Sequence, residues 1–206
     1  NISNNNIFNA SSYAIDLHTH SSTAISTGHI ITTDNNLYGS TNGLYLADNM
    51  SITNWDFSQY NIPGIVLRMY GSNNLIQDVN VSYTGAKAGT GLYINATSSS
   101  SKENNDNNII RVDFSNRTYG IRYVGYNSGW YGSFRRHNIT DSNFENNTYA
   151  ITIDNSRQYD HNITGNIFEN YSTKAISLTS TQNSTGHYLN YNDFINTNTV
   201  TNITAN

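Results

Sequence analysis

A repeated unit of roughly 20 to 30 residues limits the possible folds of this chain more than any other feature. Residues 138–144 read NITDSNF and are followed by YAITI at 149–153, while residues 162–168 read NITGNIF and are followed by KAISL at 174–178. Each copy joins an Asn-Ile pair and a Phe to a short polar turn and a second apolar segment. Apolar residues at positions i and i+2 indicate an extended strand with one buried face.

The same unit can be aligned along the whole chain. The apolar residue that ends its first segment is Phe8, Leu37, Phe57, Val81, Phe114, Phe144, Phe168 or Phe194. A unit this short cannot bury its apolar face alone, whereas stacked copies can, with each strand pairing in parallel with its equivalent one turn away. We therefore predict an all-β chain in which residues 1–206 form one right-handed parallel β-helix of about eight rungs.

These Asn-Ile-x4-Phe and Gly-Ile-x-Leu units resemble the parallel β-helix repeats of the pectin-lyase-like superfamily. More narrowly, they resemble repeat-rich surface and adhesin-like proteins of archaea and some bacteria. The resemblance covers residues 2–203 and implies the fold. It does not select a function, because this scaffold carries lyases, hydrolases, epimerases, phage tailspikes, adhesins and envelope proteins.

Composition excludes several classes of protein. Only 12% of the residues are charged, the net charge is -4 and no basic stripe exists, which argues against a nucleic-acid partner. No apolar run approaches the length of a membrane span. The chain has no Cys, so disulfides and thiolate metal sites are excluded. Because it begins at Asn1 without a Met or a signal peptide, we expect a processed chain or part of a larger surface protein.

Asparagine is abundant and often lies in Asn-x-Ser/Thr sequons, the acceptor motif for N-glycosylation. The ten candidate glycosylation sites are Asn9, Asn49, Asn80, Asn95, Asn116, Asn138, Asn146, Asn162, Asn170 and Asn183. Asn116, Asn146 and Asn170 each lie two residues after a Phe, where the turn should be exposed. Together with low charge and many Ser, Thr and Tyr residues, these sequons favour an extracellular or cell-surface location.

Two features are candidate binding surfaces. Residues 124–137 read VGYNSGWYGSFRRH, and their candidate ligand- or partner-binding residues are Tyr126, Trp130, Tyr131, Phe134, Arg135 and Arg136. Aromatic rings beside Arg are used to recognise sugars or proteins, although the same rings could instead pack onto the wall of the helix. The second feature is a predicted outward stripe of Tyr45, Val66, Tyr93 and Arg122, which would favour a lateral contact.

No set of acid, base and nucleophile is evident. In the position just before the Phe, Asp56, Asp113 and Asp193 never fall on consecutive rungs, so their carboxylates should be too far apart to share a metal. Asp16, His18 and His20 share a strand face but have no obvious third partner with them. We therefore expect no catalytic residue, no metal and no cofactor.

Neither end of the chain looks like the amphipathic cap that usually protects a solenoid, so we expect self-association or contact with neighbouring domains there. The leading hypothesis is a glycosylated, extracellular structural or adhesive protein, a building block of a surface layer, sheath or filament. The alternatives are a carbohydrate-active β-helix enzyme, such as a polysaccharide lyase or hydrolase, and a carbohydrate-binding module that uses the Trp130 loop.

Overall fold

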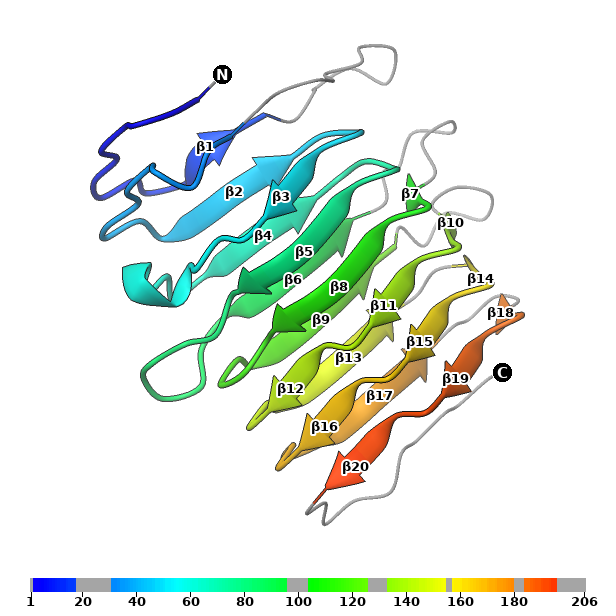
Figure 1. The fold of residues 1–206 in the computed structure, drawn as a ribbon. Helices are drawn as coiled ribbons and strands as arrows, with labels where there is room; N and C mark the ends of the chain where they lie inside the picture. The colour runs from blue at the N-terminus through cyan, green and yellow to red at the C-terminus, as the bar shows by residue number, and fades with distance from the viewer. Residues whose placement is uncertain are drawn as a thin grey trace.

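The computed structural model describes residues 2–17, 31–95, 104–125, 133–154, 157–179 and 184–195. Within these ranges the only helical element is the 3-10 turn η1 (Ser58–Tyr60), and all paired strands are parallel. The strands of successive turns lie side by side along one axis, from the first turn at one end to β20 at the other (Figure 1). The prediction of an all-β parallel β-helix is confirmed.

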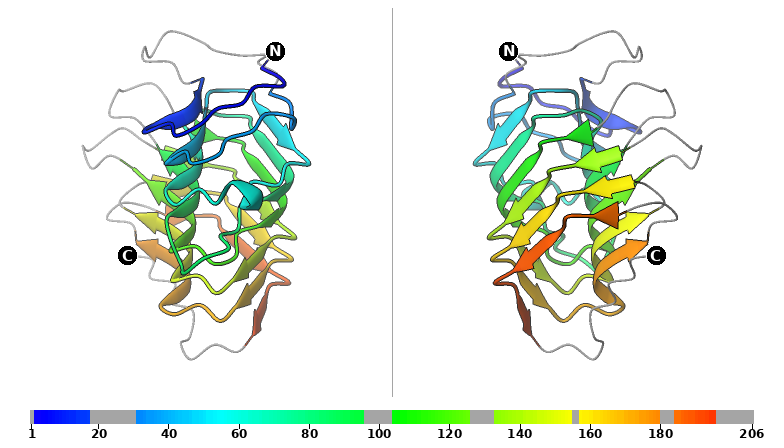
Figure 2. Two further views of the ribbon diagram at one scale, coloured as in Figure 1. Left: turned by 90° about the vertical axis from the view of Figure 1, so that its left-hand side faces the viewer. Right: turned by 90° about the vertical axis from the view of Figure 1, so that its right-hand side faces the viewer.

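The strands form three sheets around one core, and two of the sheets face each other across it (Figure 2). The first sheet contains β1 (Tyr13–Asp16), β2 (Asn42–Leu46), β4 (Ile65–Met69), β6 (Thr90–Asn95), β9 (Tyr119–Val124), β13 (Tyr149–Asp154) and β17 (Lys174–Thr179). The facing sheet contains β3 (Ser51–Thr53), β5 (Leu75–Asn80), β8 (Asn108–Asp113), β11 (Asn138–Thr140), β12 (Asn143–Glu145), β15 (Asn162–Thr164), β16 (Ile167–Glu169), β19 (Tyr188–Asn190) and β20 (Asp193–Ile195). The third contains β7 (Asn104–Asn105), β10 (Ser133–Arg135), β14 (Arg157–Tyr159) and β18 (Ser184–Thr185).

The first sheet has one strand per turn, so its seven strands correspond to about six complete turns. Partial turns extend the stack at both ends, with the bridge Ile2↔Ile31 at the N-terminal end and β19 and β20 at the C-terminal end. The predicted number of about eight rungs is therefore slightly higher than the number of complete turns.

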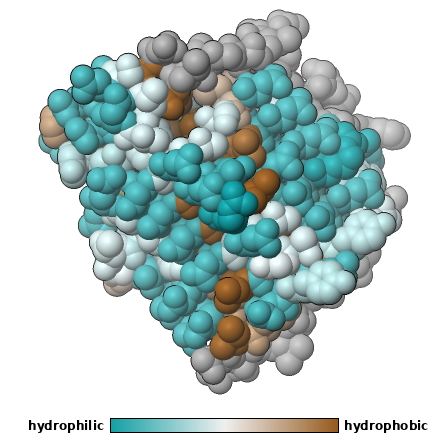
Figure 3. All heavy atoms as spheres, in the orientation of Figure 1, coloured by the Kyte–Doolittle hydropathy of each residue, from teal (hydrophilic) through white to brown (hydrophobic). Residues whose placement is uncertain are grey.

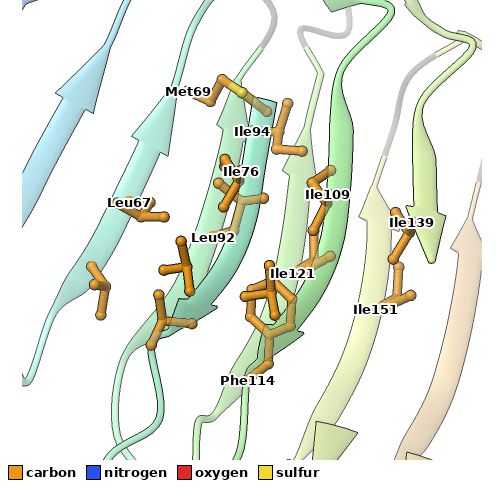
Figure 4. Close-up of a cluster of buried hydrophobic side chains, with 14 of the residues drawn as sticks. Leu67, Met69, Ile76, Leu92, Ile94, Ile109, Phe114, Ile121, Ile139 and Ile151 are labelled. Carbon is orange, nitrogen blue, oxygen red and sulfur yellow. The ribbon is translucent and has the colours of Figure 1, made fainter. Parts of the chain in front are cut away.

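Equivalent apolar side chains from successive turns form columns inside the stack (Figure 4). Ile76, Ile109 and Ile139 occupy one column of the facing sheet, while Leu92 and Ile121 oppose them from the first sheet. All of these side chains are buried, and each contributes about 1.5 to 3 kcal/mol through removal of apolar surface from water. Because every turn leaves its inner face apolar, the core depends on the stacking of turns.

In the first turn the prediction that Phe8 faces the core is wrong. The bridge between Asn6 and Asn36 places Ile7 opposite the buried Leu37, whereas Phe8 lies on the outside, where it is 61% exposed and stacks on Tyr38. Successive residues of a strand point to opposite faces, and an Ile-Phe pair offers an apolar side chain to either face. The sequence pattern alone therefore could not decide which of the two side chains is buried.

Left-handed backbone turns explain much of the asparagine content. One column of such residues runs along the turn of the facing sheet and contains Asn4, Asn54, Asp78, Arg111, Asp141, Gly165 and Tyr191. Asn, Asp and Gly adopt positive φ at lower cost than other residues, which accounts for five of these seven. Arg111 is an exception, and its guanidinium donates two hydrogen bonds to the Asp78 carboxylate one turn earlier, at 2.6 and 2.9 Å.

Candidate functional surfaces

The outer side of the first sheet carries a band of Tyr and Arg side chains. We define the Tyr–Arg face as Tyr13, Tyr45, Arg68, Tyr93, Tyr119, Arg122 and Tyr149. Tyr45, Arg68, Tyr93 and Arg122 are direct partners in successive strands. Of the predicted stripe, Tyr93 and Arg122 are partly exposed, Tyr45 lies on this side of the sheet but is buried by its neighbours, and Val66 is fully buried.

The position of Val66 was misjudged because β4 is a continuous run of mostly apolar residues. Leu44 pairs with Leu67, and Leu46 pairs with Met69, which shifts the strand by two residues from the predicted alignment. In this register Val66 lies opposite Gly91, at a position that faces the Phe114 ring, so its side chain is inside, although the apolar pattern of β4 fits either register. The shift brings Arg68, rather than Val66, between Tyr45 and Tyr93.

Arg68 is surrounded by aromatic rings. Its guanidinium carbon lies 4.6 Å from the ring centroid of Tyr45 and 5.3 Å from that of Tyr93, and its Nη1 donates a hydrogen bond to the Tyr13 hydroxyl at 3.2 Å. Such cation–π contacts fix the orientation of the guanidinium. Burial raises the pKa of Tyr45 to about 12, and the positive charge of Arg68 opposes this shift. The buried Tyr45 ring therefore stays neutral at physiological pH.

A second aromatic group lies two strands further along the same face. The Arg122 guanidinium lies over the Tyr119 ring at 4.6 Å, and its Nε is 3.7 Å from Oδ2 of Asp154. The Tyr119 and Tyr149 rings are stacked with centroids 5.1 Å apart. Within the described residues, Nε of Arg68 and Nε of Arg122 are buried and make no hydrogen bond. The Tyr–Arg face therefore combines flat rings with guanidinium groups, the combination used to bind sugars and anionic groups.

The predicted binding loop is only partly described. Tyr126, Trp130 and Tyr131 lie outside the described residues. The three other candidates do not form a common surface. Phe134 is fully buried and packs edge-to-face on Tyr123, so its assignment as a ligand-binding ring is wrong. Its strand, β10, pairs with β7 and β14, and this places Phe134 inside the stack.

The two Arg residues after Phe134 both have neighbours from adjacent turns. The Arg135 guanidinium lies 4.9 Å from the ring centroid of Tyr159, on the next turn. Arg136 adopts positive φ and donates two hydrogen bonds to Asp106, at 2.6 and 2.7 Å. The Arg136–Asp106 pair has the same arrangement as the Arg111–Asp78 pair, and both pairs connect neighbouring turns.

The sequon asparagines differ in burial from the core asparagines. Nine of the ten candidates are described, and all nine are at least partly exposed, while Asn183 lies outside the described residues. The fully buried asparagines are Asn35, Asn74, Asn104, Asn107, Asn147 and Asn166, and none of them begins a sequon. Asn116, Asn146 and Asn170 share a left-handed turn, which places three sequons in one outer column.

The buried asparagines hold consecutive turns together. Oδ1 of Asn74 accepts the Met50 N–H, and Oδ1 of Asn107 accepts the Asn74 N–H, both at 2.8 Å. In the following turns, Nδ1 of His161 accepts the His137 N–H at 3.3 Å, and Nδ1 of His187 accepts the His161 N–H at 3.4 Å. We call this series the corner column; its members are Met50, Asn74, Asn107, His137, His161 and His187.

Burial lowers the pKa of all three histidines in the corner column. The pKa of His137 falls to about 4, although its contact with the Asn104 carbonyl partly opposes the shift. The pKa of His161 is lowered well below its ordinary value by burial and by the neighbouring histidines, and that of His187 is lowered by burial. His137 and His161 are buried and neutral, so we assign them a structural role between turns, while His187 is only partly buried at the end of the stack.

The acidic column also has a structural role. Asp56, Asn80 and Asp113 lie on successive turns, and each accepts a hydrogen bond from the backbone N–H two residues later. This contact closes the turn after each strand. Among the described residues, no three His, Cys, Asp or Glu side chains are close enough together to hold a metal.

Sequence reasoning missed Tyr13, Arg68, Tyr119 and Tyr149 as surface residues. One signal was present, because Tyr119 and Tyr149 each precede the small residue that starts a buried segment. Arg68 gave no such signal, since only the register of β4 places it on the Tyr–Arg face.

The described residues contain no helix that is long and apolar enough to cross a membrane. Comparisons of the chain with protein-family models, with curated proteins and with solved structures found no match.

Proposed function

We propose that this protein is a glycosylated, extracellular structural or adhesive protein, a building block of a surface layer, sheath or filament. The observation that carries the proposal is the division of asparagines by burial. Every described sequon asparagine is accessible from outside, while the asparagines that stabilise the interior lie outside sequons. Glycans on the outer turns would leave the stacking of the turns intact.

The character of the surface is consistent with this role. Hydrophilic side chains cover most of the face formed by β5, β8, β11 and β15, as Figure 3 shows in the orientation of Figure 1. Pairs of charged side chains, such as Asp106 with Arg136, connect neighbouring turns. Resemblance of the repeat to adhesin-like surface proteins points in the same direction.

The direct test is the intact mass of the protein isolated from its natural source. The unmodified chain has a mass of 23.0 kDa, so glycosylation would appear as discrete additional masses. Peptide mapping should find glycans first at the most exposed sequons, Asn9, Asn49 and Asn170. In an N-glycosylating host, Asn170→Gln should remove one glycan, whereas Asn166→Gln should remove none. An unmodified mass for the natural protein would contradict the proposal.

A second candidate function, binding of glycans, is favoured by the Tyr–Arg face. Arg68 and Arg122 present guanidinium groups among flat rings, and such rings stack on the apolar faces of sugars. Arg68→Met should abolish retention on a glycan array if this face binds sugars. Arg111→Met is the matched control, since it removes the same charge from a turn on the opposite side. Equal retention for both variants and the unmodified protein would reject this candidate.

A further inference from the structure

The first and last turns of the stack have the same local structure. Residues 2–7 read ISNNNI and residues 189–194 read LNYNDF, and both follow the pattern of residues 163–168 in the middle of the stack. The third residue of each segment has positive φ, at Asn4, Gly165 and Tyr191. The fourth residue is Asn in all three segments. The two ends therefore present backbones of one shape.

Hydrogen bonds inside the stack define how one such turn accepts the next. Asn192 Oδ1 accepts the N–H of Asn166 at 3.0 Å, while Asn192 Nδ2 donates to the Ile163 carbonyl at 2.8 Å. Asn166 Oδ1 accepts the N–H of Ser142 in the same way, at 3.0 Å. In each of these turns a backbone N–H thus donates a hydrogen bond to the asparagine Oδ1 of the following turn.

In the part of the chain that the structure describes, the last turn has an unused donor for this contact, and the first turn has an unused acceptor. Within the described residues, the backbone N–H of Asn192 donates to no acceptor, and Asn5 Oδ1 accepts no hydrogen bond. Asn5 Nδ2 already donates to the Ser3 carbonyl at 2.9 Å, as Asn166 Nδ2 does to the Thr164 carbonyl at 3.2 Å. The Asn5 side chain is therefore held in the orientation that receives a preceding turn.

The apolar and polar columns also continue from one end to the other. Phe144, Phe168 and Phe194 are stacked with centroids 5.0 and 5.1 Å apart, and Phe194 is 42% exposed at the end of this series. The inward residue of the first turn, Ile7, packs against the same core and would cover it. Asp193 would lie below Asn6, in the order in which Asp113 lies below Asn143.

From these matches we propose that the last turn of one copy, residues 188–195, stacks in register on the first turn of a second copy, residues 2–9. This inference rests on the proposed structural role and names its partner, a second copy of this chain. Asn192 N–H donates to Asn5 Oδ1 across the contact, and Asn6 N–H donates to the Asn192 carbonyl. The contact continues the facing sheet between copies and produces an unbranched filament, because the two ends are different surfaces.

Charge placement gives a specific test of this register. Asn6→Asp puts a carboxylate directly above Asp193 of the preceding copy, at a distance of about 5 Å. The substitution keeps the Oδ1 atom that accepts the Asn36 side-chain hydrogen bond, so the first turn itself is preserved. The concentration at which copies associate should rise roughly tenfold. In the double variant Asn6→Asp/Asp193→Asn, association should return.

The matched control is Asn108→Asp. It adds one carboxylate at an exposed position in the middle of the stack and keeps the Oδ1 that Asn138 approaches at 3.5 Å. Sedimentation velocity of the 206-residue chain over a wide concentration range should show association unchanged in this control. Electron microscopy should show rods with an axial repeat of roughly 35 to 40 Å.

Two results would overturn the inference. One is a chain that stays monomeric at every concentration. The other is equal weakening of association by Asn6→Asp and Asn108→Asp, without recovery in the double variant. Neither result bears on glycosylation, because the mass of the natural protein is measured independently of association.

Discussion

At the scale of single residues, asparagine and histidine are interchangeable in the corner column. Asn107 accepts the N–H of the preceding turn through Oδ1, and His161 accepts the equivalent N–H through Nδ1. Because Nδ1 of His161 is an acceptor, the ring proton must reside on Nε2. Protonation of Nδ1 would remove the acceptor and place a charge in the core. The interior of the stack should therefore be less stable when the buried imidazoles are protonated.

This dependence predicts loss of stability in mild acid. An unfolded His binds a proton near pH 6.5, whereas buried His137 does so only near pH 4, so the unfolded chain binds more protons between these values. The free energy of unfolding should therefore fall as the pH decreases from about 6.5 to 4, by about 3 kcal/mol for His137 alone. Urea unfolding measured at several pH values checks this. Constant stability over the window would contradict it.

The variant His161→Asn separates titration from hydrogen bonding. Asn supplies the same acceptor as Asn74 and Asn107 but does not titrate, so the dependence of stability on pH should become weaker while the fold is kept. The exposed pairs Asp78 with Arg111 and Asp106 with Arg136 do not interfere. Their hydrogen bonds to Arg lower the pKa of both Asp residues, so these groups titrate below the histidine window.

At the scale of elements, the side chains that a strand can carry are limited by the side chains packed against it from adjacent turns. A Cβ atom on Gly120 would lie 2.7 Å from Cδ1 of Phe144, and one on Gly91 would lie 2.7 Å from Cδ1 of Phe114. At Gly91 and Gly120 the absence of a side chain is therefore required by the Phe ring that packs there, whereas Val66 occupies the equivalent position in β4. In these two turns the Phe and the Gly are two parts of one packing arrangement.

The Phe column predicts a graded response to substitution. Phe144→Ala removes a ring stacked between Phe114 and Phe168 and should lower the free energy of unfolding by about 3 to 5 kcal/mol. Phe144→Leu should cost less, since Leu37 and Val81 fill the same column in other turns. Urea unfolding of both variants measures the difference. Equal losses would show that ring stacking, and not filled volume, determines stability here.

At the scale of the whole molecule, each turn contacts only its neighbours, so the middle turns are supported on two sides and the end turns on one. β8 and β9 pair with strands on both sides, whereas the described strands give β20 a partner on one side only. Apolar residues are exposed at the C-terminal end, where Tyr188, Phe194 and Ile195 lie. Stability should therefore decrease from the middle of the stack to its ends.

Hydrogen exchange should reveal this gradient directly. Amide protons of β8 and β9 should exchange most slowly and those of β19 and β20 fastest, because opening an end turn breaks contacts on one side only. If copies stack end to end, protection of β20 should increase with protein concentration while that of β8 remains constant. Uniform protection along the chain would indicate that the whole stack unfolds as one unit.

The sequence by itself determined the class of fold. Each apolar segment recurs once per unit, which predicts parallel stacking, and the spacing identified the column that contains Phe57, Val81, Phe114, Phe144 and Phe168. The sequence also identified the sequon asparagines.

Only the tertiary structure decided which adjacent residue faces inward and which residues of successive turns lie side by side. In the structure Ile7 rather than Phe8 faces the core, and Arg68 rather than Val66 lies between Tyr45 and Tyr93. Phe134, predicted on a binding surface, is buried in the core. The physical reason is shared by all three. An apolar pattern fixes the spacing within a strand, whereas the register between strands depends on hydrogen bonds and packing with the neighbouring turn, which residues distant in sequence supply.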